Sequence, residues 1–485
     1  MAFMEDHGKW FAQGTFNREI LTIILLRNSL NIDLMKIMAN TLDYMRQTRI
    51  IAIAEDIPRG EHEKFKQLLL KSCENFRFTN FLLIFSNSTH GIRDTFYLKP
   101  YPAYHWDSRT GNTTPHFPQH WRNMHNKTLL TYMDRIPPRT LYYKDANGNI
   151  HLNGFVARLI MLFAERFNAT LQMALPLDFK EPTHYSVIVE NMVSNNRLDI
   201  PMVVDTSPVI NKWFNMTNTL LHDKGLLVVP CAQSLNTREV YGILLNEVFF
   251  GYVIVCTILL SLVQSLINYV YKGQLHISRL LFSELIFPGI LGQSFPMGHF
   301  SNFSSKIIYF LLFIAGLYLN TTFSVNVSTL FTHPPHHRQI ETMQELLKSP
   351  VKILLLDIEA EVMGHEIKHL ARAFTTTDNF TYLQELRNNL NTSYGYYFSS
   401  PAWQMLLLKQ QFFEKKIFCT YDNLTLFPNL LWAIPLPHNS PYKEGLNYLI
   451  EQLKAYGLCN DTITSVCWGE LAAAKVTSQT IYLIQ

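Results

Sequence analysis

The sequence predicts two mixed α/β regions that flank a helical membrane region. Three observations predict this class: two long uncharged runs, a low content of charged residues, and alternating strand-like and helix-like segments on both sides of the runs. Charged residues make up 16% of the 485 residues, whereas soluble domains contain about 25%. We therefore expect the middle of the chain to contact membrane lipid.

The first membrane span is predicted at 241–271. Its central run, Val248–Val270, contains no charged side chain. At 1.5 Å per residue a helix over this run reaches about 34 Å, and the hydrocarbon core of a bilayer is about 30 Å thick. A buried helix of a soluble domain would not need so long an uncharged run.

The second span is predicted at 306–332, and its second half is lined with Asn, Thr and Ser. Polar side chains at membrane depth face a bundle interior or a water-filled path. This half therefore either lines such a path or holds helices together.

A re-entrant loop is predicted between the spans, at 280–297. The segment is too short to cross and contains Glu284 and Pro288. Irregular backbone is tolerated at membrane depth only when it is buried in protein or lines a cavity. The short basic connections around it place that side in the cytoplasm, so both α/β regions are expected to be extracellular.

The density of Asn-x-Ser/Thr sequons outside the spans supports an extracellular location. The glycosylation candidates are Asn87, Asn112, Asn126, Asn168, Asn215, Asn379, Asn391, Asn423 and Asn460.

Three cysteines lie in the C-terminal region: Cys419, Cys459 and Cys467. A disulfide is expected there if that region is extracellular.

An N-terminal domain is predicted over 1–126. Strand-like runs at Ile20–Arg27, Arg49–Asp56 and Asn80–Ser86 alternate with helical stretches, a pattern typical of a parallel sheet. No glycine-rich loop follows these strands, so a nucleotide site is not supported. The net charge of +3 and the lack of a basic stripe argue against nucleic-acid binding.

The segments 127–236 and 333–468 are also mixed α/β. Val351–Glu359 reads as a buried strand, and Gly445–Gly457 carries apolar residues at the spacing of one helix face. Because these segments are separated by the spans, we expect each to contribute to one clamp with two lobes.

The order of these parts resembles ionotropic glutamate receptors, and their divergent arthropod branch, the chemosensory ionotropic receptors, in particular. The family's gate motif is SYTANLAAFLT, and Thr322–Thr332 reads TFSVNVSTLFT, with Asn326 and Thr332 identical. Asn149–Leu171 and Arg197–Thr217 resemble segments of the first lobe. GILGQS resembles the pore loop, with Gln293 near the selectivity position. The resemblance covers roughly 127–468.

The resemblance implies a periplasmic-binding-protein-like bilobed clamp above a helical pore, with Thr322, Asn326, Thr329 and Thr332 in the gate. The chain would be a multi-pass plasma-membrane subunit of a ligand-gated cation channel for taste or smell. It would assemble with co-receptor channel subunits and bind a small molecule. We expect no cofactor, no metal and no catalytic step.

Two departures from the family concern the ligand. Asn211 or Lys212 stands where the family has its carboxylate-binding Arg, and Ser399 stands where it has the acid that binds the ligand ammonium. Charge-assisted hydrogen bonds are about twice as strong as neutral ones, so we expect a ligand other than glutamate. The positional candidates for the pocket are Thr206, Asn211 and Ser399.

The two ends also depart from the family. The family has another membrane helix after the second lobe, whereas the tail 469–485 contains no such run. The start has no secretory signal pattern, so either the first span serves as the targeting signal or the recorded start is incomplete. A truncated sequence would explain both ends.

A pairing of Cys419 with Cys467 or Cys459 would resemble the disulfide in the second lobe of the family.

Two alternatives stay open. His365, Glu366 and His369 fit the H-E-x-x-H pattern of zinc proteases, but Lys368 lies within the motif and no clear third ligand follows. We favour a solvated helix there. The chain could instead be a non-conducting accessory or receptor subunit that binds a ligand or partner.

Overall fold

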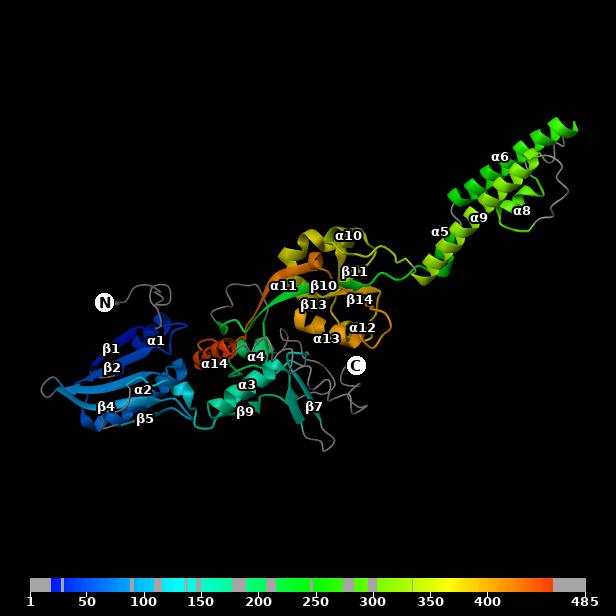
Figure 1. Cartoon of the computed structure of the whole chain (residues 1–485). Coiled ribbons are helices and arrows are strands. Elements are labelled where there is room, and N and C mark those ends of the chain that lie inside the picture. The colour runs from blue at the N-terminus through cyan, green and yellow to red at the C-terminus, as the bar shows by residue number, and fades with distance from the viewer. Residues whose placement is uncertain are drawn as a thin grey trace. The chain divides into compact units, whose positions relative to one another are not determined.

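The computed structural model describes residues 19–27, 30–87, 91–108, 116–134, 136, 138–144, 150–176, 189–205, 215–244, 247–273, 283–294, 303–333 and 335–456. The chain divides into two compact units: Met1–Pro230 with Glu341–Gln485, and Cys231–Ile340. The first unit is mixed α/β and the second is helical (Figure 1).

The N-terminal sheet has the order β1-β2-β3-β4-β5. The first three strands are parallel, as predicted, and two helices connect them. The last two strands run antiparallel and were not predicted. Met35, Leu69 and Leu83 are fully buried in its core. The elements are β1 (Leu21–Arg27), α1 (Ile32–Thr41), β2 (Arg49–Glu55), α2 (His62–Phe76), β3 (Phe81–Asn87), β4 (Gly91–Lys99) and β5 (His105–Asp107).

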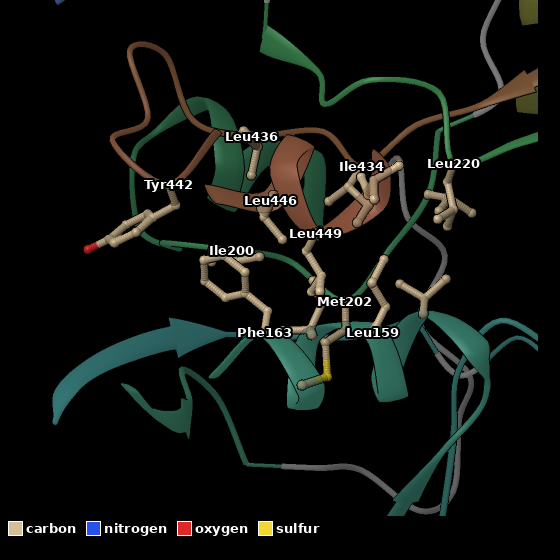
Figure 2. Packing of buried hydrophobic residues seen from close by; sticks show 14 of the residues in the cluster. Leu159, Phe163, Ile200, Met202, Leu220, Ile434, Leu436, Tyr442, Leu446 and Leu449 are labelled. Atoms are coloured by element: carbon tan, nitrogen blue, oxygen red, sulfur yellow. The ribbon is translucent and has the colours of Figure 1, made fainter. Parts of the chain in front are cut away.

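A hydrophobic cluster that is separate from the core of the N-terminal sheet, and that we call the first core, joins two distant stretches of the chain. The buried face of α3 carries Leu159 and Phe163, and that of α14 carries Leu446 and Leu449, at the spacing of one helix face. Figure 2 shows these four side chains within one cluster. The elements are β6 (Lys127–Thr131), β7 (Leu141–Lys144), β8 (Ile150–Asn153), α3 (Phe155–Arg166), β9 (Ala169–Met173), α4 (Glu190–Ser194) and α14 (Lys443–Ala455).

Another hydrophobic cluster, which we call the second core, packs on a sheet of order β12-β11-β13-β10-β14. In this sheet β15 is also paired to β10. β11 is parallel to β12 and β13, whereas β10 is antiparallel to β13. The elements are β10 (Leu221–Pro230), α10 (Met343–Lys348), β11 (Lys352–Leu356), α11 (Asp357–Ile367), β12 (Phe374–Thr377), α12 (Phe380–Asn388), β13 (Tyr394–Ser399), α13 (Ser400–Gln410), β14 (Phe418–Cys419) and β15 (Thr425–Trp432).

Two strands connect the first and second cores. β10 and β15 pair antiparallel, with Leu221 opposite Trp432. These two residues are buried in the first core, and Val228, further along β10, is buried in the second. The two cores are therefore joined by neighbouring strands that come from separate parts of the sequence.

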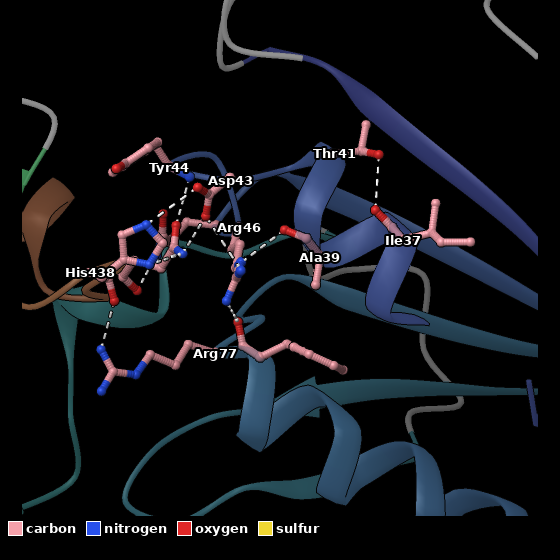
Figure 3. A network of polar contacts seen from close by, with 11 residues as sticks. Ile37, Ala39, Thr41, Asp43, Tyr44, Arg46, Arg77 and His438 are labelled. Atoms are coloured by element: carbon pink, nitrogen blue, oxygen red, sulfur yellow. Dashed lines mark hydrogen bonds and ion pairs between the residues drawn. The ribbon is translucent and has the colours of Figure 1, made fainter. Parts of the chain in front are cut away.

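The N-terminal sheet is held to the loop before α14 by a polar cluster, the Asp43 network (Figure 3). The Asp43 carboxylate contacts Asn439 Nδ2 at 2.8 Å and His438 Nε2 at 3.3 Å. The Tyr44 N–H donates to Asn439 Oδ1 at 2.6 Å, and Arg77 donates to the His438 carbonyl oxygen at 2.9 Å. The sheet is thus fixed to the first core by side chains as well as by the linking chain.

The helical unit contains two helices that are long and apolar enough to cross a membrane, α6 and α9. They correspond to the predicted spans 241–271 and 306–332. Both contact the short α8, whose Ile286 and Ile290 are fully buried. A methyl group at Gly316 of α9 would overlap the Gly289 carbonyl oxygen, so glycine permits this close approach. The elements are α5 (Thr237–Leu244), α6 (Glu247–Lys272), α8 (Ile286–Ile290) and α9 (Phe303–Thr332).

Candidate binding site and membrane helices

The second core has a sheet edge at which several functional side chains meet. β11 and β13 are parallel, and each is followed at once by a helix, α11 and α13. In open α/β sheets, ligands bind outside the carboxyl ends of parallel strands. β10 enters at this edge because it is antiparallel to β13, with Gly225 opposite Ser399. The edge therefore combines residues from before α6 and after α9.

Four side chains share one face of this edge. Side chains alternate between the faces of a sheet, so Asp223 lies on the same face as position Gly225. Ser399 and Phe427 are both paired with Gly225, and Tyr397 lies two residues before Ser399. The alternation of buried and exposed residues from Leu221 to Gly225 agrees with this assignment. We call this group the Asp223 edge: Asp223, Tyr397, Ser399 and Phe427.

Gly225 lets two aromatic rings close over the strand. A Cβ atom at Gly225 would lie 2.6 Å from the Tyr397 hydroxyl oxygen and 2.9 Å from Phe427 Cδ2. The two rings are nearly perpendicular, with centroids 6.2 Å apart. The absence of a side chain at Gly225 therefore shapes an aromatic corner beside Asp223.

Asp223 is 9% exposed, and its two carboxylate oxygens differ in their hydrogen bonds. Oδ1 accepts hydrogen bonds from the backbone N–H of Lys224 at 2.6 Å and of Ser400 at 3.3 Å. Oδ2 is buried and has no hydrogen-bond partner among the described residues. Burial raises the pKa of Asp223, and the hydrogen bonds from Ser400 and Lys224 oppose that rise only in part.

Arg387 of α12 lies on the other face of the sheet. The Arg387 guanidinium lies 5.1 Å from the Phe398 ring centroid and 5.9 Å from that of Tyr396. It also donates to the Tyr397 carbonyl oxygen at 3.2 Å. Burial lowers the pKa of Arg387. Arg387 is thus engaged with rings and backbone, and it forms no ion pair with Asp223.

The negative charges of nearby carboxylates affect the pKa of the Tyr397 hydroxyl. Burial raises the pKa of this hydroxyl, and Glu359 and Asp223 raise it further, while Arg387 opposes them. Tyr397 is therefore a neutral hydrogen-bonding group at physiological pH. It can donate a hydrogen bond or present its ring face to a cation.

Only one of the three predicted pocket residues can be placed. Ser399 is the N-cap residue of α13, and its side chain makes no capping hydrogen bond. Thr206 and Asn211 lie outside the described residues. Sequence reasoning missed Asp223 and Tyr397. The available signal was one carboxylate, Asp223, among the inward positions of the strand LHDKGLLVVP, which are otherwise apolar.

The predicted gate residues are exposed along α9. Thr322, Asn326 and Thr329 recur at four- and three-residue spacing, which places them on one helix face. Thr329 Oγ1 donates to the Val325 carbonyl oxygen at 2.6 Å and Thr332 Oγ1 to that of Ser328 at 2.7 Å. The hydroxyls of Thr329 and Thr332 are thus hydrogen-bonded within the helix.

The predicted re-entrant segment 280–297 is described from 283 to 294 and contains α8. Gln293 follows this helix, is exposed, and donates its backbone N–H to the Pro288 carbonyl oxygen at 2.9 Å. A Cβ atom at Gly292 would lie 3.5 Å from Asn320 of α9. The segment is thus packed against α9 next to its polar half.

The glycosylation candidates differ in accessibility. Asn126, Asn168, Asn379 and Asn423 are exposed. Asn215 and Asn391 are half-buried, Asn87 ends β3, and Asn112 and Asn460 lie outside the described residues.

Two cysteines are disulfide-bonded, Cys231 and Cys419. Cys459 and Cys467 lie outside the described residues, and the involvement of Cys231 was not anticipated from the sequence. Cys73 and Cys256 are free.

The H-E-x-x-H pattern does not lie on one continuous α-helix. α11 ends at Ile367, and Lys368–Ala373 forms a 3-10 helix. His369 therefore lies beyond the α-helix that contains His365. No group of three His, Cys, Asp or Glu residues that could hold a metal ion occurs among the described residues.

A cavity of about 530 Å³ lies between β6, β9 and α4. Leu130, Met173, Met192 and Arg197 are among its lining residues. It shares no residue with the Asp223 edge and contains no carboxylate.

No protein-family model matches the chain, and none of the curated proteins matches it.

Proposed function

We propose that the chain is a subunit of a ligand-gated cation channel that serves taste or smell at the plasma membrane. The observation that carries this proposal is the pairing of β10 with β15. These strands join the first and second cores, while α6 and α9 lie between them in the sequence. A clamp built from the two cores would therefore have a strand hinge, and both α/β regions would be extracellular.

The proposed gating mechanism is a shift between two clamp states. A ligand that binds the closed clamp more tightly than the open one shifts the population towards closure by its difference in affinity. Ten residues separate the end of α9 at Thr332 from the start of α10 at Met343. Movement of the second core would therefore pull on the end of α9 through this short linker.

The proposed pore is lined by the polar face of α9. Thr322, Asn326 and Thr329 supply hydroxyl and amide groups, and such side chains at membrane depth face water-filled paths or other helices. The short α8 and Gln293 would form the re-entrant loop. Because one chain supplies one such face, the pore requires co-receptor subunits of the same architecture.

The ligand is proposed to be a small molecule other than glutamate. The family's carboxylate-binding Arg and its ammonium-binding acid are replaced here by Asn211 or Lys212 and by Ser399. A ligand held by two charge-assisted contacts would lose both of them.

Cysteine accessibility combined with current recording tests the channel. The chain, in a Cys256→Ser background, is co-expressed with a broadly expressed ionotropic-receptor co-receptor and exposed to a panel of tastants and volatiles. We expect ligand-evoked cation currents, and block by a cationic thiol reagent in Thr322→Cys and Asn326→Cys. Ile314→Cys, in the apolar half of α9, is the matched control and should stay unblocked.

Surface delivery is checked by labelling intact cells. A surface-delivered chain that yields no ligand-evoked or constitutive current would contradict the channel proposal. Ligand binding without current would instead support a non-conducting accessory subunit.

A further inference from the structure

We infer that the Asp223 edge binds the positively charged nitrogen of the ligand, so the ligand class is organic ammonium compounds. This inference rests on the proposed ligand-binding function. It concerns a carboxylate that comes from β10 and two aromatic rings, from β13 and β15.

The first argument is the unmatched charge of Asp223. Charged side chains are almost never fully buried unless they are paired. Asp223 is nine-tenths buried, yet its Oδ2 has no hydrogen-bond partner among the described residues and forms no ion pair. The available cations are engaged or exposed: Arg387 stacks on the opposite face and Lys224 points to solvent. No described residue therefore supplies a counter-charge to Asp223 Oδ2, and a bound ligand would supply it.

The second argument separates the structural role of Asp223 from its charge. Oδ1 accepts from the Ser400 N–H and so caps the start of α13 from a neighbouring strand. The side-chain oxygen of an asparagine caps a helix equally well. Capping therefore explains an oxygen at this position but not a carboxylate. A buried ionisable group that structure alone does not require is a candidate functional group.

The third argument is the aromatic corner. The rings of Tyr397 and Phe427 are nearly perpendicular and lie on the same face of the sheet as the carboxylate. Both rings fit there because Gly225 has no side chain. Ammonium groups bind the faces of aromatic rings, and a carboxylate beside the rings completes the usual recognition of an amine.

The same geometry excludes an anionic group at this point. The start of α13 would attract an anion through its free N–H groups. However, the Ser400 N–H already donates to Asp223 Oδ1. Asp223, with Glu359 nearby, would repel a second carboxylate, since both carboxylates raise the pKa of Tyr397. The edge therefore discriminates between amines and acids of equal size.

Isosteric probes test this inference directly. The full chain, purified in lipid nanodiscs, is titrated with n-butylamine, tetramethylammonium and n-butyrate, and binding is followed by thermal shift and calorimetry. We expect the two cations to bind and butyrate not to bind. Asp223→Asn should weaken binding of the cations at least about tenfold, because the charge is lost while the capping oxygen remains.

The control variant is Asp378→Asn, which removes an exposed carboxylate of the same core. It should bind both cations like the wild type. An unchanged far-UV spectrum and a cooperative unfolding transition confirm that Asp223→Asn is folded. Equal binding by wild type and Asp223→Asn, preferential binding of butyrate, or no binding of either cation would overturn the inference.

The outcome is distinguishable from failure of the channel proposal. Amine binding that depends on Asp223 but evokes no current in co-expressing cells would refute the channel and keep the ammonium site. Currents evoked by an uncharged ligand with equal potency in wild type and Asp223→Asn would keep the channel and refute the ammonium site.

Discussion

Asp43 Oδ1 accepts a hydrogen bond from Asn439 Nδ2 at 2.8 Å, although 396 positions separate the two residues. The contact joins the N-terminal sheet to the loop that leads into α14, whose apolar face belongs to the first core. The same carboxylate contacts His438 and Arg46. A single side chain thus ties the beginning of the described chain to its last helix.

Asp43→Ala should destabilise this connection. It removes one acceptor shared by Asn439, His438 and Arg46, and each buried donor left unpaired costs about 1–3 kcal/mol. Hydrogen exchange in residues 437–440 should accelerate, and urea unfolding should start at lower concentration. Asp94→Ala, at an exposed position of β4, should change the unfolding free energy by less than about 0.5 kcal/mol. Equal protection in both variants would argue against a structural role for the Asp43 network.

Asp223→Asn should stabilise the folded chain at neutral pH. Burial raises the folded-state pKa of Asp223 above its unfolded value, so the folded state binds the proton more tightly. Between the two pKa values, stability then falls as pH rises. The charged form costs stability above the folded pKa, and acid relieves that cost. Thermal unfolding should be measured from pH 4 to 8. We expect Asp223→Asn to melt at a higher temperature than the wild type at pH 8, and the difference in melting temperature to disappear in acid. A difference that does not change with pH would contradict the raised pKa of Asp223.

Gly225→Ala should disturb the aromatic corner. The added methyl group would lie within 3 Å of Tyr397 and Phe427, which forces both rings to move. Overpacking of this kind costs about 1–3 kcal/mol, and we also expect weaker binding of n-butylamine. Gly60→Ala, where the added methyl meets open space, is the control. Wild-type stability and binding in Gly225→Ala would show that the corner is not fixed by this glycine.

Gly316→Ala should separate α8 from α9. The methyl group would meet the Gly289 carbonyl oxygen, which is backbone and cannot rotate away. We expect a lower melting temperature in detergent, with a cost of about 1–3 kcal/mol. Gly251→Ala places the same change in α6, where no atom lies nearby, and should leave the melting temperature unaltered or higher. The close approach would be refuted by indistinguishable melting of the two variants.

Asn168 and Asn423 should carry glycans on the same side of the membrane. Asn168 lies directly before β9 and Asn423 lies shortly before β15, and β10 with β15 joins their two cores. Each Asn→Gln change should increase the gel mobility of the expressed protein, and both changes together should increase it further. Glycosidase treatment of each variant provides the unglycosylated reference. Modification of only one of the two sites, with the other facing the cytoplasm, would refute the shared location.

The three parallel strands of the N-terminal sheet could be predicted because each of them is a run of mostly apolar residues. Ile20–Arg27 and Arg49–Asp56 match β1 and β2 to within one residue. β4 and β5 were missed because Gly91–Lys99 and His105–Asp107 carry several polar residues and show no such run. Local pattern therefore identified the parallel strands and failed at the antiparallel edge of the sheet.

The Asp223 edge could not be predicted, because its partners are not local. Gly225 pairs with Ser399 across the whole segment that contains α6 and α9, and no periodicity within either strand encodes that pairing. Ser399 was singled out only by resemblance to a family motif. The buried state of Asp223 depends on β13 and β15 lying on either side of β10, which the sequence of β10 does not contain.

The position of β10 also sets an order for biosynthesis. This strand is made before α6 and α9, yet every neighbour it pairs with, from β13 to β15, is made after them. If α6 and α9 span a membrane as proposed, the newly made strand would stay unpaired, with its backbone amide and carbonyl groups exposed, until both helices have been made and inserted. A chaperone that binds unpaired strands would then have its longest opportunity at this point.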